Sequence, residues 1–318
     1  MDDKRKVGPR HRARTAARWA SAARWGWAAP LLAMTACTPA RLLTNFDRLT
    51  SGTEARRVAT GIAYGTEGRQ KLDIWAPRRA SAEKLPVVIF FYGGGWNEGS
   101  RGDFGFAGAA YAGHGFIAVL PDYRLVPQVR FPTFVEDGAS SVRWVRDNIA
   151  RYGGDPERIT IAGHSAGAYI GAMLALDQRY LGAAGVAPGT VRAAALLAGP
   201  YDFLPFDDAR SRNAFGGWTT PEQTQPITFA SSAAPPLFLA HGSGDRVVGQ
   251  RNSKALAARL QQAGAPVTLR IYPGANHVDL VSSLAGAFRG KTPVLAESAA
   301  FLKQQSQPRA ETRRLQAR

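Results

Sequence analysis

The pentapeptide Gly163-His164-Ser165-Ala166-Gly167 constrains the fold more than any other part of the sequence. It comes one residue after the β-branched run Ile159–Ile161 and shortly before an apolar, helix-like stretch from Tyr169 to Leu176. In such a strand, turn and helix, small residues two positions before and after the serine let the chain pass. The Ser165 hydroxyl then lies beyond the strand, and the Ala166 N–H lies at a helix N-terminus, where it can stabilise negative charge. Ser165 is therefore the candidate nucleophile; a serine in an ordinary turn is the alternative.

Around this turn, strand-like apolar runs alternate with helical patterns. Val87–Tyr92 is an unbroken apolar run, which is typical of a parallel strand covered on both faces. Further strand-like runs are Phe116–Leu120, Val191–Ala198, Pro236–His241 and Val267–Tyr272. Helical patterns cover Ala107–His114, Pro132–Tyr152, Asn252–Ala263 and Pro293–Gln304. The runs Val58–Tyr64 and Lys71–Ala76 alternate, which predicts an antiparallel pair at the sheet edge. The pattern predicts one α/β domain over residues 58–307, with a doubly wound, mostly parallel sheet and helices on both faces.

Residues 201–234 break this alternation. They are rich in Phe, Asp, Thr and Pro, have no lasting period, and form a longer segment than connections in compact domains usually do. They follow a strand at the edge where open α/β sheets bind ligands. We expect a lid or a pocket wall; a surface insertion without a function is the alternative.

The first 36 residues resemble a targeting segment. A basic region extends to Arg24, twelve uncharged residues follow from Trp25 to Ala36, and the only cysteine is Cys37. Such a run is too short to cross a bilayer but fits a signal peptide. Met34-Thr35-Ala36-Cys37 resembles the lipobox of bacterial lipoproteins, in which the cysteine is acylated. We expect a lipoprotein-type signal peptide at 1–36, a linker at 37–57 and a lipid anchor on Cys37.

This interpretation places the protein in the cell envelope, in the periplasm and anchored to the membrane. The alternatives are secretion without an anchor, a retained signal anchor, and a buried free thiol in a cytosolic enzyme. A single cysteine permits no disulfide within one chain, so the domain depends on its hydrophobic core.

The positive charge is concentrated at the ends of the chain. Residues 1–36 carry +6 of the formal net charge of +16, and residues 308–318 form a basic tail. The sequence has no basic groove with interleaved aromatic residues and no nucleic-acid recognition motif. We therefore expect no nucleic-acid partner.

A serine hydroxyl needs a general base near neutral pH, usually a histidine that a carboxylate orients. Of the five histidines, His11 lies in the targeting segment, His114 lies at a helix end, and His164 is next to the nucleophile, so its side chain should point elsewhere. His241 ends a strand, whereas His277 stands in a Gly-rich loop beyond the last strand. In enzymes with this kind of serine turn, the triad follows the chain order nucleophile, acid, histidine. His277 comes after acidic residues that themselves follow Ser165, so it is the candidate base.

Asp245 is the candidate acid. It lies four residues beyond the strand Pro236–His241, at the edge where Ser165 and His277 should emerge. Other acidic side chains considered for this role are Asp202, Asp207, Asp208 and Asp279. Asp202 is the main rival because it follows the preceding strand, whereas Asp279 is too close to His277 in a tight loop. Asp245 could instead cap the following segment as a helix N-cap.

The run Gly93-Gly94-Gly95 follows the first buried strand and predicts the other half of an oxyanion hole. A strand that turns sharply there presents unpaired N–H groups to a substrate oxygen, and side chains would block this approach. Gly94 and Gly95, together with Ala166, are the candidate donors.

The motifs favour neither a cofactor nor a metal. The run Gly242-Ser-Gly-Asp-Arg-Val247 lacks the third glycine of a dinucleotide fingerprint, and the sequence has no complete Gly-x-x-x-x-Gly-Lys-Ser/Thr phosphate loop. The histidines are scattered and the lone cysteine lies in the leader, so no metal site is predicted.

Six motifs in order resemble those of the α/β-hydrolase fold: Tyr92-Gly-Gly-Gly-Trp96, Pro121-Asp-Tyr-Arg-Leu125, Tyr152-Gly-Gly-Asp-Pro156, Gly163–Gly167, His241-Gly-x-x-Asp245 and Asn276-His277. The resemblance covers about residues 58–305. Its closest branch is the carboxylesterases related to hormone-sensitive lipase and to feruloyl-esterase-like and arylformamidase-like enzymes. It implies that Ser165, Asp245 and His277 form the triad.

One departure from the family pattern concerns the oxyanion loop. The family usually has a histidine where Tyr92 stands, and that histidine supports the loop without belonging to the triad. We expect Asp122, Tyr123 and Arg124 to be structural polar groups at a strand end.

The sequence thus predicts a serine hydrolase that cleaves small-molecule carboxylic esters through an acyl-enzyme. An amidase of the arylformamidase type is the alternative within the same chemistry. A catalytically inactive binding protein of the envelope on the same fold is an alternative of another class.

Overall fold

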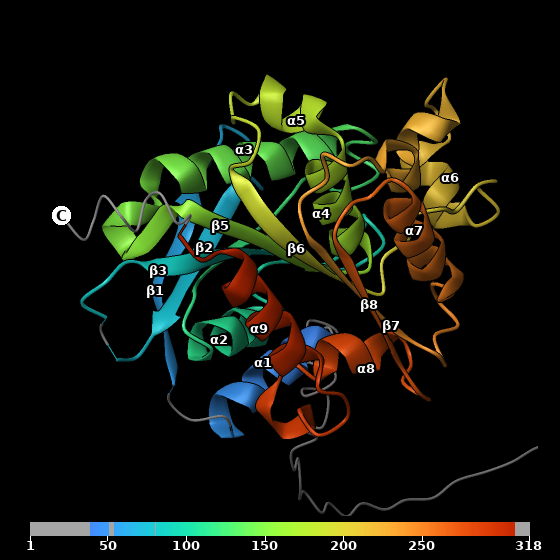
Figure 1. Cartoon of the computed structure of the whole chain (residues 1–318). Coiled ribbons are helices and arrows are strands. Elements are labelled where there is room, and N and C mark those ends of the chain that lie inside the picture. Colours follow the sequence, from blue (N-terminus) through green and yellow to red (C-terminus); the bar gives the residue numbers. More distant parts are fainter. Residues whose placement is uncertain (1–38, 51–53, 80, 309–318) are drawn as a thin grey trace, which may run out of the picture. The chain divides into compact units, whose positions relative to one another are not determined.

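The computed structural model describes residues 39–50, 54–79 and 81–308, all within the unit Cys37–Arg318 (Figure 1). In this part of the chain eight strands form one sheet in the order β1-β2-β4-β3-β5-β6-β7-β8. Their bounds are β1 Ala55–Ala63, β2 Lys71–Pro77, β3 Leu85–Phe91, β4 Ile117–Pro121, β5 Gly154–His164, β6 Val191–Leu197, β7 Leu237–Gly242 and β8 Val267–Tyr272. Strand β2 is antiparallel to β1 and to β4, and the remaining neighbours are parallel. The prediction of a mostly parallel sheet with an antiparallel pair at its edge is confirmed.

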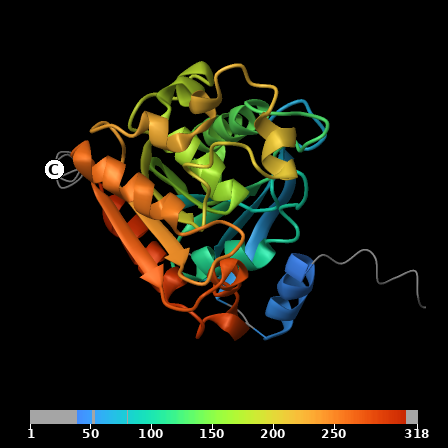
Figure 2. The same ribbon diagram turned by 90° about the vertical axis from the view of Figure 1, so that its right-hand side faces the viewer.

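The helices of the described residues are α1 Pro39–Thr50, α2 Gly105–Gly113, α3 Thr133–Asn148, α4 Ala166–Leu176, α5 Gln178–Ala183, α6 Ala209–Phe215, α7 Arg251–Gln262, α8 His277–Ser282 and α9 Val294–Gln305. Short 3-10 turns are η1 Ile149–Tyr152, η2 Pro221–Thr224, η3 Pro226–Phe229 and η4 Gly286–Phe288. Helices α3 and α4 cover one face of the sheet, α2 and α9 cover the other, and α7 packs on β7 and β8 (Figures 1 and 2).

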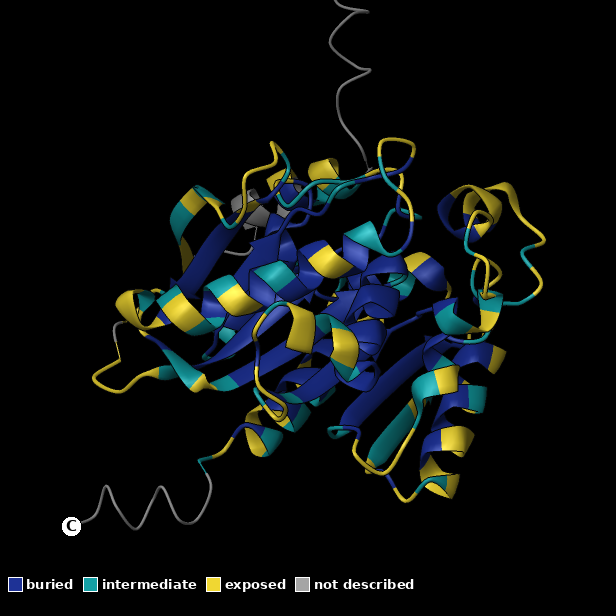
Figure 3. Ribbon diagram, turned by 90° about the horizontal axis from the view of Figure 1, so that it is seen from above, coloured by how far each residue is buried: buried dark blue, intermediate teal, exposed yellow. Residues whose placement is uncertain are grey.

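The core lies between these layers. Every residue of β3 from Val87 to Phe91 has no exposed surface, and the helix α4 is buried along its whole length (Figure 3). Apolar runs without alternation are required here because both faces of the central strands are covered. Because the central strands are packed on both faces, the strand ends that carry the candidate site residues are held in place.

The predicted linker at 37–57 is wrong over most of its length. Residues Pro39–Thr50 form helix α1, and β1 begins at Ala55. Leu43 packs against the core, and the Thr44 hydroxyl donates to the carbonyl oxygen of Asp103 at 2.5 Å. The helix is amphipathic, but its apolar stripe is short, so only the tertiary contact distinguishes it from a linker. The predicted signal peptide, Cys37 and residues 309–318 of the predicted basic tail lie outside the described residues.

The other predicted helices and strands agree with the structure to within a few residues. The structure also contains short helices that the sequence did not predict. Segment 201–234, predicted as a lid or pocket wall, contains α6, η2 and η3. The residues of α8, His277–Ser282, were expected to lie in a loop. No helix of the described residues is long and apolar enough to cross a bilayer.

Parallel strands bring their carboxyl ends to one edge of the sheet. Strand β3 leads into Gly93–Gly95, β5 into Ser165, β7 into Asp245 and β8 into His277. Segments that are far apart in the sequence therefore meet at this edge.

Candidate active site

The turn at Ser165 has the backbone of a nucleophile elbow. Ser165 has φ 54° and ψ −122°, a strained region for a residue with a side chain, and its N–H donates to the carbonyl oxygen of Leu197 at 2.9 Å. The turn packs closely against β3, and a side chain two residues after Ser165 would not fit: a Cβ on Gly167 would lie 2.0 Å from the carbonyl oxygen of Phe91. The α4 helix starts at Ala166, immediately after the serine. The local spacing therefore folds as the sequence predicted.

The glycine run after β3 packs directly on this elbow. A Cβ on Gly93 would lie 3.1 Å from the Cβ of Ser165, and a Cβ on Gly94 would lie 2.2 Å from the carbonyl oxygen of Glu98. Gly94 also has φ 131°, which a side chain disfavours. Among the hydrogen bonds of the described residues, none uses the N–H of Gly94, Gly95 or Ala166. These three donors are free to bind a substrate oxygen.

Asp245 and His277 are joined at the same edge of the sheet. Asp245 Oδ2 lies 2.7 Å from His277 Nδ1, and the two side chains have exposed fractions of 0% and 11%. A carboxylate only accepts, so Nδ1 carries the proton and Nε2 is left as the basic nitrogen. His277 is the first residue of α8, whose start is fixed by a capping box between Asn276 and Asp279.

The Asp245 carboxylate is held by further donors. Its Oδ1 accepts from the N–H groups of Val247 and Val248, both at 2.9 Å, within a turn. The alternative that Asp245 is a helix N-cap is wrong, because the next helix, α7, begins at Arg251 and its N-cap is Gln250. Burial favours a higher pKa for Asp245, but the hydrogen bonds from His241 and His277 outweigh burial and hold that pKa well below its ordinary value. Asp245 is therefore ionised near neutral pH.

His241 is the other histidine that the sequence left as a possible base, and its ring contacts groups other than Ser165. It is fully buried, and its Nε2 lies 2.7 Å from the carbonyl oxygen of Val248 and 3.3 Å from Asp245 Oδ2. Its Nδ1 lies 2.8 Å from the hydroxyl of Ser253. These contacts occupy both ring nitrogens, so His241 supports the carboxylate and has no nitrogen left for the serine.

The expectation that the His164 side chain points elsewhere is wrong. Its ring centroid lies 4.7 Å from that of His277, and its Nε2 donates to the backbone oxygen of His277 at 3.0 Å. Burial and the neighbouring His277 lower the pKa of His164 to about 3. His164 thus remains a neutral donor that ties the elbow to α8, which the sequence pattern did not reveal.

The other acidic candidates have separate contacts. The backbone N–H of Asp202 donates to Asn252 Oδ1, Asp208 caps α6, and Asp279 is paired with Lys291. The hydrogen bond to the His277 ring comes from Asp245. In the described part of the chain no three His, Cys, Asp or Glu side chains are grouped as metal ligands would be.

A cavity of about 590 Å³ opens over these residues. It is lined by Ser165, His277, the three glycines and Ala166. One wall comes from α1, the start of α2 and α8, and another from the segment 201–234, which contributes Phe203 and Arg210. The predicted lid segment and the unpredicted helix α1 therefore both border the candidate nucleophile.

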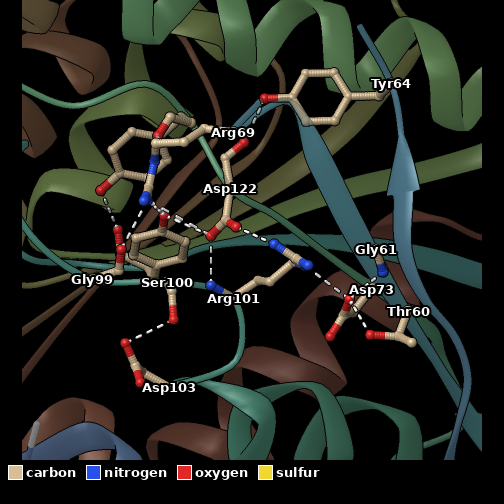
Figure 4. A network of polar contacts seen from close by, with 12 residues as sticks. Thr60, Gly61, Tyr64, Arg69, Asp73, Gly99, Ser100, Arg101, Asp103 and Asp122 are labelled. Atoms are coloured by element: carbon tan, nitrogen blue, oxygen red, sulfur yellow. Dashed lines mark hydrogen bonds and ion pairs between the residues drawn. The ribbon is translucent and has the colours of Figure 1, made fainter. Parts of the chain in front are cut away.

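A polar network around Asp122 (Figure 4) is joined to Tyr92, the residue directly before the oxyanion loop. The Tyr92 hydroxyl donates to Asp122 Oδ1 at 2.9 Å and accepts from Arg69 at 2.8 Å. Arg69 also donates to the carbonyl oxygen of Gly99 at 2.8 Å, and Arg101 links Asp122 to Asp73. Burial and the nearby Asp122 raise the pKa of Tyr92 well above its ordinary value. Tyr92 thus supplies a polar support where the family usually has histidine.

The expected structural role of the strand-end residues is confirmed. Besides Asp122, the Tyr123 hydroxyl donates to the carbonyl oxygen of Tyr92 at 2.9 Å. Arg124 pairs with the buried Asp137 at 2.7 Å. None of these contacts involves the candidate nucleophile or base.

The strand order, the elbow after β5 and the edge where these groups meet define an α/β-hydrolase. Solved structures agree on the fold: an inhibited esterase B from Lactobacillus rhamnosis superposes with a TM-score of 0.70 at 19% identity, covering 82% of this chain and 92% of that chain. Thermogutta terrifontis esterase 2 phosphonylated by sarin gives a TM-score of 0.64 at 26% identity, covering 79% and 94%.

Residues 72–260 match the BD-FAE family, and the chain belongs to this family. Among curated relatives, esterase LipQ of Mycobacterium tuberculosis is 35% identical over 244 residues, covering 70% of this chain and 58% of that protein. Isoprenylcysteine alpha-carbonyl methylesterase ICME of Arabidopsis thaliana is 31% identical over 276 residues, covering 80% and 64%. The chain thus spans about three fifths of the length of these relatives. The resemblance to α/β-hydrolase carboxylesterases is confirmed.

Proposed function

We propose that the chain is a serine esterase in which Ser165, His277 and Asp245 act as the catalytic triad. The observation that carries this proposal is the Asp245–His277 hydrogen bond at the cavity that the strained Ser165 lines. Relatives whose names denote esterases or a methylesterase support ester over amide substrates.

In the first half-reaction the Ser165 hydroxyl attacks the ester carbonyl carbon, and His277 Nε2 takes the hydroxyl proton. The carbonyl oxygen becomes an oxyanion that accepts from the free N–H groups of Gly94, Gly95 and Ala166. Asp245 stabilises the imidazolium through Nδ1. When the tetrahedral intermediate collapses, the bond to the alcohol oxygen breaks and His277 returns the proton to the leaving alcohol.

In the second half-reaction water attacks the acyl-enzyme. His277 takes one proton of the water, the same backbone donors hold the oxyanion, and the proton returns to Ser165 as the carboxylic acid leaves. The reaction needs only water and the ester. The buried His241 and the backbone N–H groups at Asp245 keep the carboxylate fixed during both steps.

A labelling and kinetic experiment tests this proposal. A fluorophosphonate probe should modify wild-type protein at Ser165 and leave Ser165→Ala unlabelled. Wild type should hydrolyse p-nitrophenyl esters, with Ser165→Ala as the blank, and should act more slowly on aryl formamides. Folded wild type without an adduct would favour the inactive binding protein, and faster cleavage of the formamides would favour the amidase.

We propose further that the protein resides in the cell envelope, anchored by a lipid on Cys37. The support is the sequence alone, with the lipobox-like Met34-Thr35-Ala36-Cys37 after an uncharged run. In membrane fractionation with globomycin, an inhibitor of lipoprotein signal cleavage, wild type should accumulate as an uncleaved form. If processed Cys37→Ser still partitions with membranes as wild type does, the lipid anchor is wrong.

A further inference from the structure

Three large apolar side chains of the described residues are exposed, and two of them line the cavity. Leu42, Val247 and Val278 have exposed fractions of 56%, 64% and 61%. Val247 and Val278 line the cavity, and Leu42 is next to Leu43, which also lines it. We define these three residues as the apolar rim. Scattered exposed apolar residues need no explanation, but two of these line the cavity and the third lies on α1, a helix that also contributes to the lining, which indicates a binding surface.

The apolar rim is held in place by hydrogen bonds. The N–H of Val247 donates to the Asp245 carboxylate and the N–H of Val278 donates to Asn276 Oδ1, each at 2.9 Å. Thr44, two residues after Leu42, fixes α1 to Asp103. Turning the valines inward would break contacts of the Asp245 turn and the α8 cap, so their exposure is built into the candidate active site.

The apolar surface continues from the rim into the cavity. Leu43 from α1, Phe104 and Phe106 from the start of α2, and Val281 from α8 line the wall on this side. Figures 1 and 2 show α1 beside the C-terminal segment that carries α8. An apolar chain can therefore pass from the rim toward Ser165 along apolar side chains.

Basic side chains lie beside the rim. Arg246 precedes Val247, Arg251 lines the cavity, and Arg289 follows η4, which packs against α1. All three are exposed, and in the described part of the chain no ion pair with an acidic side chain is found for them. A second copy of this chain would bring these cations against their counterparts, whereas an anionic apolar surface would complement them.

The acidic residues that face the cavity lie elsewhere. Glu98 lies beyond the oxyanion glycines, and Asp207 and Asp208 lie at the start of α6 in the segment 201–234. Asp279 on α8 is paired with Lys291. None of the three acidic residues that line the cavity is next to a rim residue in sequence, and the acidic neighbour of Val278 is already paired with Lys291.

We propose that the apolar rim docks on an anionic phospholipid surface, and that the cavity takes esters with a long apolar chain from it. The substrate part rests on the proposed esterase function, whereas the docking part does not. Helix α1 begins two residues after Cys37, so the proposed anchor would hold the start of α1 within about 7 Å of chain from the lipid-bearing residue. An apolar side chain flanked by cations is the composition of surfaces that bind anionic membranes.

Vesicle binding tests the docking. Full-length Cys37→Ser protein, which carries no lipid, is sedimented with phosphatidylcholine vesicles with and without phosphatidylglycerol. Replacing the rim by Leu42→Ser, Val247→Ser and Val278→Ser together should weaken partitioning about 100-fold, because each apolar side chain contributes about fivefold. The melting temperature checks that the triple variant is folded. Equal partitioning of parent and triple variant would overturn the proposal.

A charge pair provides a second, folding-neutral test. Arg246→Gln with Arg289→Gln should weaken binding to phosphatidylglycerol vesicles about 30-fold at low salt. The matched control Arg143→Gln with Arg151→Gln, on α3 and η1, removes the same charge from the side of the sheet opposite α1 and should bind like the parent (Figure 1). If both double variants bind the vesicles equally weakly, the effect comes from net charge alone, and the rim is not the docking surface.

Activity separates this proposal from the esterase assignment. Ser165→Ala should bind vesicles like the parent and hydrolyse nothing. The Arg246→Gln and Arg289→Gln pair should keep hydrolysis of p-nitrophenyl acetate in solution and show a raised KM for a long-chain p-nitrophenyl ester held in anionic vesicles. Loss of a dimer in the rim triple variant by light scattering, with vesicle binding unchanged, would make a second copy the occupant and overturn the proposal.

Discussion

The substitution His164→Gln should remove a defined part of the pH dependence of stability. His164 is fully buried beside His277, and burial lowers its pKa to about 3. An unfolded histidine titrates near about 6.5. Between these values the unfolded state holds a proton that the folded state lacks, so acidification favours unfolding. The penalty is absent well above pH 6.5 and grows as the pH falls toward 3.

The size of this effect follows from the two pKa values. Between them the free energy of unfolding falls by about 1.4 kcal/mol per pH unit. From pH 7.5 to pH 5.0 the expected loss from His164 is about 2 kcal/mol. Glutamine cannot take up this proton, and its amide can donate where His164 Nε2 donates to the backbone of His277.

Urea unfolding at pH 7.5 and pH 5.0 measures the effect. Wild type should lose about 2 kcal/mol more than His164→Gln on acidification, since all other titrating groups are shared. His114→Gln, which removes a partly exposed histidine at the end of α2, is the control and should follow wild type. If wild type and His164→Gln lose the same free energy, the buried, neutral state of His164 is refuted.

Three further substitutions test the support of the site. Tyr92→Phe removes a hydroxyl between an arginine and an aspartate and should lower the free energy of unfolding by about 1–2 kcal/mol, as urea titration would show; an unchanged midpoint would contradict this support. Gly167→Ala places a Cβ 2.0 Å from a β3 carbonyl and should cost about 3 kcal/mol or more, whereas Gly182→Ala, with open space, should be neutral or stabilising by up to about 1 kcal/mol. Asp245→Asn should lower kcat on p-nitrophenyl butyrate by about four orders of magnitude by disturbing the His277 tautomer; a residual rate within tenfold of wild type would exclude Asp245 as its partner.

Much of the fold could be predicted because it is encoded in local patterns. The unbroken apolar run Val87–Tyr92 requires a strand covered on both faces, and β3 is such a strand. The elbow at Ser165 depends on glycines two residues away on either side, so its geometry follows from five consecutive residues. Since the carboxyl ends of parallel strands share one edge, the order of the strands along the chain also indicated that Asp245 and His277 could meet.

Other features depend on contacts between distant segments, and the sequence pattern could not supply them. Helix α1 was predicted as a linker because its stability comes from packing beside α2 and η4, not from its own short apolar stripe. His164 was expected to point away, yet its ring reaches the backbone of His277, 113 residues later. The spacing of residues along the chain predicts which face of a strand or helix a residue occupies, but it does not predict which distant segment packs against that face.

The sequence by itself therefore determined the α/β layering, the serine turn and the candidate acid and base, because each follows from short-range periodicity and the direction of parallel strands. Only the tertiary structure decided that Tyr92, Arg69 and Asp122 form one network under the oxyanion loop. It also decided that exposed valines from the Asp245 turn and from α8 line the same cavity. The physical reason is that burial and hydrogen bonding are properties of the space between segments, which is set only when the whole sheet has closed on its helices.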